Sequence, residues 1–285
     1  MKKSLPIYSA IALFLLLGSM LAACAPAAQP DGGGESAEAT PELNIPIEDL
    51  LVYIPAGSFY MGSDQDADPL AEEDEVPLHN VLLPGFFIYR NEVSNGLYKQ
   101  CVAAGVCSNP EIFDEGPSTH YNDPAYAEYP VVGVNWDQAN AFCSWADSRL
   151  PTEAEWEKTA RGEFGNLYPW GDDSPSCSLN NMEGCITDPP DTDEIGQYPE
   201  GDSYYEAGDM AGNVWEWTSS SYLPYPAPAK DTRKPAPEFV QRGGSFLCDP
   251  NMCEGFRATA RNHATPETAL MHVGFRCAGD AIGRS

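Results

Sequence analysis

The sequence predicts an irregular α+β domain with low secondary-structure content. Its 285 residues include 26 prolines and 25 glycines, many of them after residue 162. Proline removes a backbone donor and glycine weakens helices and strands, so these residues leave only short regular segments. Nine cysteines accompany them. A loop-rich chain with this many cysteines is typical of a domain that disulfides and bound ions stabilise.

The first 23 residues have the pattern of a lipoprotein signal peptide. Lys2 and Lys3 precede a short apolar run at 11–20, which is shorter than the roughly 20 residues that a membrane-spanning helix needs. The following Leu-Ala-Ala-Cys24 resembles a bacterial lipobox, which implies cleavage before Cys24 and acylation of its thiol. An ordinary signal peptide with an incidental cysteine is the alternative. With acylation, we expect a lipid-anchored, extracytoplasmic protein of the bacterial cell envelope.

The remaining chain is predicted to hold one folded domain. Residues 24–45 carry the lipidated cysteine and then alanine, proline, glycine and acidic residues, a composition that cannot form a core and predicts a flexible tether. Residues 46–280 show no internal repeat or second linker, so we expect a single domain there, followed by a short tail at 281–285.

The charge of the chain argues against some partners. Its formal net charge is −28, from 43 acidic and 15 basic residues. Nucleic-acid binding requires a basic surface, so we expect no nucleic-acid partner. An anionic membrane surface is an equally poor partner, which leaves the lipid anchor as the expected contact with the membrane. A solvated acidic surface also favours solubility outside the cell.

Short strands and two helices are predicted in the first half of the domain. Apolar runs predict strands at 51–54, 86–89 and 131–134. Ser94 is expected to cap a helix that ends near residue 104, and Asp137 is expected to cap the next. In that second helix four residues fall on one face at helical spacing: Ala139, Phe142, Cys143 and Ala146.

A third helix is predicted from Thr152 to about residue 161. Thr152 and Glu155 form a capping-box sequence, in which each side chain accepts a hydrogen bond from the other residue's backbone N–H. Beyond this helix, long irregular stretches with scattered aromatic residues follow. Long loops without secondary structure in a compact domain are typical of functional segments.

Eight short motifs occur in order along the domain and resemble those of the formylglycine-generating, sulfatase-modifying enzyme family. The resemblance covers roughly residues 50–278, and so many ordered motifs make a chance match very unlikely. It implies a single irregular domain related to C-type lectins. The motifs are Met61-Gly62, Glu92-Val-Ser94, Val134-Asn-Trp136, Arg149-Leu-Pro-Thr-Glu-Ala-Glu-Trp156, Tyr168-Pro-Trp-Gly171, Asp209-Met-Ala-Gly-Asn-Val-Trp-Glu-Trp217, Arg242-Gly-Gly-Ser245 and Gly274-Phe-Arg276.

The resemblance implies an oxidase that uses copper and oxygen. Members of the family convert a cysteine within a Cys-x-Pro-x-Arg segment of an unfolded sulfatase to formylglycine. Cys248 and Cys253 match the two active-site cysteines, and Ser245 matches the active-site serine. Two thiolates are soft ligands that select Cu(I). A structural Cys248–Cys253 disulfide is the competing interpretation, because disulfides are common outside the cell.

The other cysteines are expected to form disulfides. By the resemblance, Cys143 and Cys277 match a family disulfide that joins distant parts of the domain. Two further pairs bracket short loops, so local bridges are their simplest pairing: Cys101 with Cys107, and Cys177 with Cys185.

The resemblance also implies two calcium sites. The first would use the carboxylates of Asp209 and Glu216 and the backbone carbonyls of Gly212 and Val214, hard oxygen ligands that suit calcium. A second, weaker match would use Asn180 and the backbone of Asn181. Its acidic ligand falls where the spacing of this chain departs from the family, which leaves Asp188 and Asp191 as candidates.

His272 is a departure from the family pattern. It replaces an active-site asparagine four residues before the arginine of Gly-Phe-Arg. Its candidate roles are a surface histidine, a base near the thiols or an additional metal ligand. Related iron-dependent members use three histidines from a separate helical domain, whereas this chain has four histidines, no His-x-x-x-His and no such domain.

The leading hypothesis is a membrane-anchored, copper-dependent enzyme that forms formylglycine on an exported protein, such as a sulfatase. The alternatives are a non-catalytic, lectin-like binding module and an accessory lipoprotein, both with a structural Cys248–Cys253 disulfide. Free, copper-binding thiols would favour the enzyme, and an oxidised pair would favour the binding module.

Overall fold

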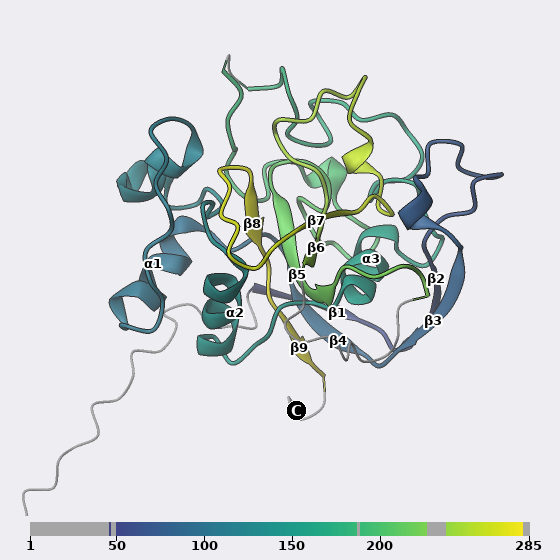
Figure 1. Ribbon diagram of the computed structural model, residues 1–285, viewed down its shortest axis with the longest axis horizontal. Coiled ribbons are helices and arrows are strands. Elements are labelled where there is room, and N and C mark those ends of the chain that lie inside the picture. The colour runs from purple at the N-terminus through teal and green to yellow at the C-terminus, as the bar shows by residue number, and fades with distance from the viewer. Residues whose placement is uncertain (1–45, 47–49, 187–188, 227–237, 282–285) are drawn as a thin grey trace, which may run out of the picture. The chain divides into compact units, whose positions relative to one another are not determined.

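Three small sheets organise the described part of the chain in the computed structural model (Figure 1). The model describes Pro46 and residues 50–186, 189–226 and 238–281. The predicted signal peptide, Cys24 and the tether up to residue 45 lie outside the described residues, as does the candidate ligand Asp188. Within the described ranges, no helix is both long and apolar enough to cross a membrane.

Each sheet combines short strands from distant parts of the sequence. The first sheet is antiparallel and has the order β1-β4-β9, and the second is the β2-β3 hairpin. The third has the order β7-β6-β5-β8, with β5 and β8 parallel. The strand bounds are β1 Leu51–Ile54, β2 Gly57–Met61, β3 His79–Leu83, β4 Phe86–Tyr89, β5 Trp215–Ser221, β6 Phe239–Arg242, β7 Asn262–Ala264, β8 Val273–Phe275 and β9 Ala278–Asp280.

Three α-helices and several short 3-10 helices complete the described structure. The α-helices are α1 Asn95–Ala103, α2 Trp136–Trp145 and α3 Glu153–Arg161. The 3-10 helices include η2 Glu73–Glu75, η3 Pro117–Asn122, η4 Pro124–Tyr126, η5 Pro199–Gly201 and η6 Glu254–Phe256. This low content of regular structure confirms the predicted irregular α+β class.

The predicted helices are confirmed, but one predicted cap is wrong. Ser94 caps α1 by accepting a hydrogen bond from Leu97 N, and Thr152 and Glu155 form the predicted capping box of α3. The cap of α2 is Asn135, which exchanges hydrogen bonds with Gln138. Asparagine caps as well as aspartate. Asp137 instead lies in the first turn, where its negative charge faces the positive end of the helix dipole.

Two of the three predicted strands are confirmed. The strands at 51–54 and 86–89 are β1 and β4, which pair with each other. The segment 131–134 is buried but is not a strand, so that prediction is wrong. Its backbone bonds to scattered loops: Val131 N donates to Val93 O, and Gly133 N donates to Leu270 O. Apolar sequence therefore predicted its burial but not its irregular partners.

The hydrophobic core lies on both sides of the β7-β6-β5-β8 sheet. Figure 1 shows α1 and α2 on one side of this sheet, and α3 with the β2-β3 hairpin on the other. The first side packs Phe142 of α2 against Phe275 of β8, with ring centroids 5.5 Å apart. The second side packs Trp156 of α3 with residues of β1 and β4. The third sheet thus lies between α1 and α2 on one side and α3 with the β2-β3 hairpin on the other (Figure 1).

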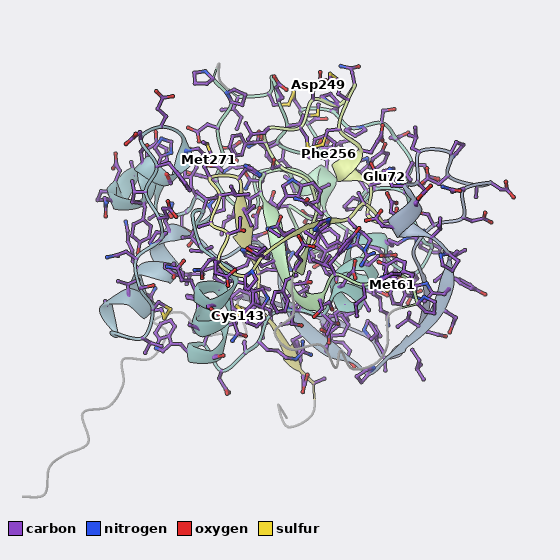
Figure 2. All side chains as sticks on the ribbon, in the orientation of Figure 1. Met61, Glu72, Cys143, Asp249, Phe256 and Met271 are labelled. Carbon is purple, nitrogen blue, oxygen red and sulfur yellow. A yellow bond between two sulfur atoms is a disulfide. The ribbon has the colours of Figure 1, made fainter. Side chains whose placement is uncertain are left out.

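The structure contains the three disulfides that the sequence led us to expect. Two are local, Cys101–Cys107 and Cys177–Cys185, with sequence separations of 6 and 8. The third joins Cys143 of α2 to Cys277, across a separation of 134. Figure 2 shows Cys143 beside the helices, at the opposite end of the domain from Asp249. The long bridge therefore ties the end of the chain to a helix in its middle.

Candidate functional site

The cysteine loop, residues 243–253, follows directly from a buried arginine at the end of β6. The guanidinium of Arg242 is fully buried and forms an ion pair with Glu157 of α3. It also donates to the carbonyl of Ala258, at 3.1 Å. A buried charge of this kind needs partners in place, because removing one would leave the other uncompensated. Arg242 therefore fixes where the loop begins.

Two glycines let the chain turn sharply after Arg242. Gly243 and Gly244 have φ angles of 103° and 76°, which side chains rarely adopt. A Cβ on Gly244 would lie 3.0 Å from the ring of Phe256. The Gly-Gly pair is therefore required for the turn and for the close packing of the loop on η6.

Cys248 and Cys253 lie together on this loop and form a disulfide in the structure, with Cα atoms 5.2 Å apart. Cys248 is buried, and Cys253 is partly exposed. Both sulfurs lie against an apolar cluster that includes Tyr168, Met182 and Phe256. The pair is thus partly buried, and Cys253 is the more accessible of the two cysteines.

The backbone of the loop is fixed on both sides of Cys248. Cys248 N donates to Ser245 O at 3.0 Å, and Glu183 N donates to Cys248 O at 3.1 Å. Glu183 lies within the loop closed by Cys177–Cys185, so that local disulfide supports a contact to the pair. No pattern in the sequence indicates this support, because it depends on a contact between distant loops.

Between the cysteines, Asp249 organises a tight turn. Asp249 Oδ1 accepts hydrogen bonds from the backbone N and the Nδ2 of Asn251, both at 2.9 Å. Its backbone carbonyl accepts from Met252 N and Cys253 N, at 2.9 and 2.8 Å. The donors of Asn251 stabilise the carboxylate and lower the pKa of Asp249.

Ser245 is part of the loop, whereas His272 is connected to it through Trp215. Ser245 is buried, and its Oγ accepts a hydrogen bond from Leu247 N at 3.3 Å, so it shapes the approach to Cys248. The backbone carbonyl of His272 accepts from Trp215 N at 2.9 Å. Burial lowers the pKa of His272, which favours the neutral imidazole.

Trp215 is a neighbour of the pair to which the sequence analysis assigned no functional role. A Cβ on Gly255 would lie 2.9 Å from the indole of Trp215 and 3.2 Å from Cys253 Sγ. The indole therefore reaches the segment that carries Cys253, while the backbone of Trp215 bonds to His272. In the sequence, only Gly255, two residues after Cys253, could have indicated this close approach, because a glycine often marks a place where another group comes near the backbone.

The first predicted calcium site lies in a buried cluster of charge. Glu216 accepts hydrogen bonds from Arg276 on both oxygens, at 2.6 and 2.7 Å, and from Trp156 Nε1 at 2.8 Å. Asp209 Oδ2 accepts from Gly196 N at 2.6 Å. Buried Glu92 lies with them and bonds through Oε1 to Asn213 Nδ2 at 3.2 Å. No pattern in the sequence indicates that Glu216 pairs with Arg276.

Negative charge is in excess in this cluster. Burial, followed by the nearby charges of Asp209 and Glu216, raises the pKa of Glu92 well above its ordinary value. Burial also raises the pKa of Asp209, to about 6. Three carboxylates face one arginine, so a cation or bound protons would offset the excess. Among the described residues, these acidic side chains do not form a metal-ion site by themselves, and Glu216 already has protein partners, so calcium here stays a prediction.

The turn at Gly212 and Val214 connects the two predicted calcium sites. Gly212 has a φ of 85°, and a Cβ there would lie 2.3 Å from Asn181 O, so only glycine fits. Asn180 and Asn181 are almost fully buried, and their side-chain Oδ1 atoms have no hydrogen-bond partner among the described residues. Buried oxygens without donors fit a hard cation. Asn180 Oδ1 is therefore a suitable oxygen for the weaker sequence match, whereas the predicted backbone carbonyl of Asn181 accepts from Asn213 N at 3.0 Å.

Asp191 reaches the second predicted site through its backbone. Its carbonyl accepts a hydrogen bond from Asn181 Nδ2 at 2.9 Å. Its carboxylate Oδ2 lies 3.6 Å from His120 Nε2, and its Oδ1 accepts from Thr192 N. The side chain of Asp191 thus has other partners in this structure.

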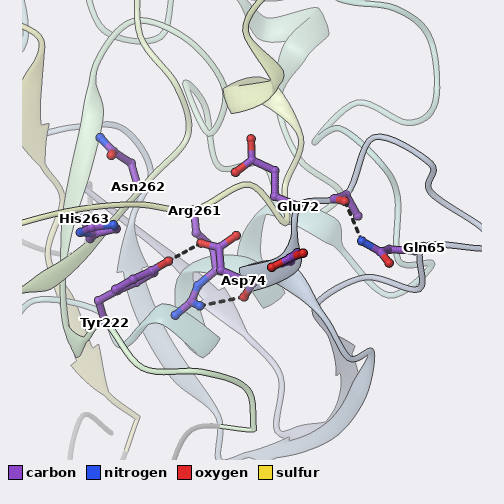
Figure 3. Close-up of a pocket in the computed structure, with 9 residues that line it drawn as sticks. Gln65, Glu72, Asp74, Tyr222, Arg261, Asn262 and His263 are labelled. Atoms are coloured by element: carbon purple, nitrogen blue, oxygen red, sulfur yellow. Dashed lines mark hydrogen bonds between the residues drawn. The ribbon is translucent and has the colours of Figure 1, made fainter.

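A separate cleft of about 640 Å³ lies beside η2 (Figure 3). Arg261 pairs with Glu153 at 2.7 Å and donates to Asp74 O at 2.8 Å. The hydroxyl of Tyr222 donates to Asp74 Oδ2 at 2.7 Å. None of the predicted catalytic or metal-binding residues lines this cleft. Its lining residues are Gln65, Ala71, Glu72, Glu73, Asp74, Tyr222, Arg261, Asn262 and His263.

The sequence of this chain matches a known protein family and several of its members. Residues 37–281 match the family model described as a sulfatase-modifying factor enzyme 1-like domain. The chain is 31% identical to the formylglycine-generating enzyme of Mycobacterium tuberculosis (strain ATCC 25618 / H37Rv), over 81% of this chain and 98% of that protein. It is also 31% identical to hercynine oxygenase of Mycolicibacterium smegmatis, over 80% of this chain and 61% of that protein.

A solved structure shares the fold. The structure of PvdO from Pseudomonas aeruginosa aligns with a TM-score of 0.67 and 27% sequence identity, covering 81% of this chain and 94% of that one. The family match includes all three sheets and the cysteine loop. The likeness therefore extends over the whole described domain rather than one motif.

Proposed function

Because this chain belongs to the sulfatase-modifying factor family, we propose that it oxidises a cysteine of a protein substrate to formylglycine, with Cys248 and Cys253 as the reactive pair. One observation carries the proposal. The Gly-Gly turn after Arg242 brings both sulfurs together on one short loop, with Cys248 buried and Cys253 partly exposed. A half-open pair of this kind is accessible to a substrate thiol.

The donor set of the pair fits Cu(I). Two adjacent sulfurs are soft ligands, and two protein ligands leave room for a third from the substrate. Bound Cu(I) would supply the activation of oxygen. The disulfide of the structure must first be reduced by two electrons, and an added thiol is a reductant of the required class. The thiols then lose their protons to become ligands.

The oxidation has a defined balance. The Cβ–S bond and one Cβ–H bond of the substrate cysteine break, a C=O bond forms, and the sulfur leaves as hydrogen sulfide. One atom of O₂ enters the aldehyde and the other leaves as water, with two electrons and two protons from a thiol reductant. In the protein, we assign Ser245 and neutral His272 to hydrogen bonding on the substrate side, since burial favours an uncharged imidazole.

The substrate and the location of the protein are part of the proposal, and the sequence supports them. The proposed substrate is an exported protein, such as a sulfatase, that presents a Cys-x-Pro-x-Arg segment in an unfolded form. Acylation at Cys24 would hold the enzyme at the cell envelope. The acidic surface, with a net charge of −28, is compatible with a substrate segment that carries arginine.

The proposed function predicts a specific product. The full chain is incubated in air with Cu(I), a thiol reductant and a peptide containing Cys-x-Pro-x-Arg, and the peptide is analysed by mass spectrometry. We expect loss of the cysteine sulfur and formation of an aldehyde that a hydrazine probe captures. A peptide with serine in place of cysteine is the control. An unchanged cysteine peptide, with Cu(I) bound to the protein, would contradict formylglycine formation.

We also propose calcium at the two clusters described above. Asp209, Glu216 and the carbonyls of Gly212 and Val214 would hold one ion, and Asn180 and Asn181 would contribute to another. Chelation with EGTA is then expected to lower the melting temperature by roughly 5 °C, because buried carboxylates lose the cation that offsets them. Thermal unfolding with EGTA, and after calcium or magnesium is added back, measures the effect.

A matched pair of variants tests the calcium assignment. Asn180→Ala should reduce the calcium-dependent part of the melting temperature, whereas Asn80→Ala, at an exposed position of β3, should leave it unchanged. A melting temperature that is the same with EGTA and with calcium would contradict the assignment.

The Cys248–Cys253 disulfide favours a second candidate function. If the pair remains oxidised, the domain is a non-catalytic, lectin-like binding module or an accessory lipoprotein for another enzyme. Such a protein would retain its disulfide in the reductant used above and would bind no Cu(I). The state of the two thiols, measured by alkylation, therefore separates the two functions.

A further inference from the structure

We propose that Asp249 is a positioning residue that holds Cys248 and Cys253 in bridging geometry independently of the bond between them. The observation is the turn between the two cysteines, Asp249-Pro-Asn-Met252. Aspartate at the first position and proline at the second favour a tight turn, because the side chain accepts from the backbone two residues on and proline presets φ. The hydrogen bonds of Asp249 close this turn.

The contacts of Asp249 act on the second cysteine and on the turn between the two cysteines. Its carbonyl accepts from Cys253 N at 2.8 Å, which places the second cysteine directly. Its Oδ1 accepts from the backbone and side chain of Asn251, both at 2.9 Å, which fixes the turn between them. The first cysteine is held separately, by Ser245 O and Glu183 N.

None of these hydrogen bonds uses a sulfur atom. The turn therefore persists when the disulfide is reduced, and the two thiols remain close to each other. Close thiols form a disulfide more readily, and they also bind one metal ion together with less loss of conformational freedom. One loop can thus serve the oxidised and the reduced forms without rearrangement.

Two properties of Asp249 have to be separated, its hydrogen-bond acceptor and its charge. Asp249→Ala removes the side-chain acceptor and the charge, and it keeps the backbone carbonyl that accepts from Cys253 N. Asp249→Asn keeps an acceptor oxygen at the same place and removes the charge. Elsewhere, Asp123 precedes Pro124 and accepts from Ala125 N at 2.9 Å, so Asp123→Ala removes a similar contact away from the cysteines. These three variants form a matched set.

The test measures the thiol–disulfide equilibrium of the pair in the full chain with glutathione. In this exchange the protein S–S bond forms, the S–S bond of oxidised glutathione breaks, and two protein thiol hydrogens pass to the two reduced glutathiones. The fraction of the peptide carrying Cys248 and Cys253 in each form is read by alkylation and mass spectrometry. Asp249 acts on the pair whether or not it oxidises a substrate, so the result is independent of the proposed activity.

We expect Asp249→Ala to lower the equilibrium constant for disulfide formation about tenfold, which corresponds to about 30 mV. Asp249→Asn should stay within about twofold of the unchanged protein, and Asp123→Ala should match it. Circular dichroism and the intact Cys143–Cys277 bridge establish that each variant is folded. An unchanged constant in Asp249→Ala would overturn the proposal, and so would an equal loss in Asp249→Asn, which would assign the effect to charge.

Discussion

Replacing Cys253 by serine is expected to abolish both formylglycine formation and Cu(I) binding. Serine offers a hard hydroxyl in place of the soft thiolate, so the pair loses one of its two copper ligands. In the presence of the reductant, the melting temperature should change little, because the unchanged protein then also lacks the Cys248–Cys253 bond. Product is measured on the Cys-x-Pro-x-Arg peptide, and Cu(I) by competition with a chelator.

The neighbouring residue offers the control for this variant. Met252 is 83% exposed, on the same turn, so Met252→Ser changes the loop without changing a proposed ligand. It should retain product formation and Cu(I) binding. If Cys253→Ser still formed product, Cys253 would not be part of the reactive pair. If it melted far below the unchanged protein in reductant, the thiol would have a structural role that the proposed chemistry does not require.

Replacing both Cys143 and Cys277 by alanine is expected to lower the free energy of unfolding by about 4 to 5 kcal/mol. The bridge joins residues separated by 134 positions, so it removes much conformational freedom from the unfolded chain. Both cysteines are fully buried within the core on the α1 and α2 side of the sheet. The corresponding loss of melting temperature is roughly 10 to 15 °C.

A short bridge of the same domain provides the comparison. Cys101 and Cys107 are separated by only 6 positions, so replacing both by alanine should cost about 2 kcal/mol. Chemical denaturation of the two double variants measures the difference. Equal losses in the two variants would show that local packing, rather than the length of the closed loop, determines the stabilisation.

Local sequence signals predicted much of the secondary structure of the first half. The capping box at Thr152 and Glu155 predicted the start of α3 correctly, because its hydrogen bonds join residues only three positions apart. At α2 the predicted cap was two residues too late in the sequence, since Asn135 and Asp137 are both suitable capping residues. The strand predicted at 131–134 is wrong for another reason. Strand formation depends on a partner, and its partners are loops around Val93 and Leu270.

The candidate site was predictable where it is local and unpredictable where it depends on distant contacts. Cys248, Cys253 and Ser245 lie within nine residues of one another, and the Gly-Gly turn before them is visible in the sequence. The partnership of Glu216 with Arg276 joins positions 60 apart, and no spacing rule indicates it. The approach of Trp215 to Cys253 likewise depends on how two segments pack.

The order in which the sheets are assembled has a consequence for synthesis. Strand β9 pairs with β4, and the edge strand β8 pairs with β5 of the third sheet. A chain emerging from the ribosome therefore exposes the unfinished edges of two sheets until the residues up to Asp280 have been synthesised. Folding is then limited by closure of these long-range pairings, which makes it slow relative to a domain built from local contacts.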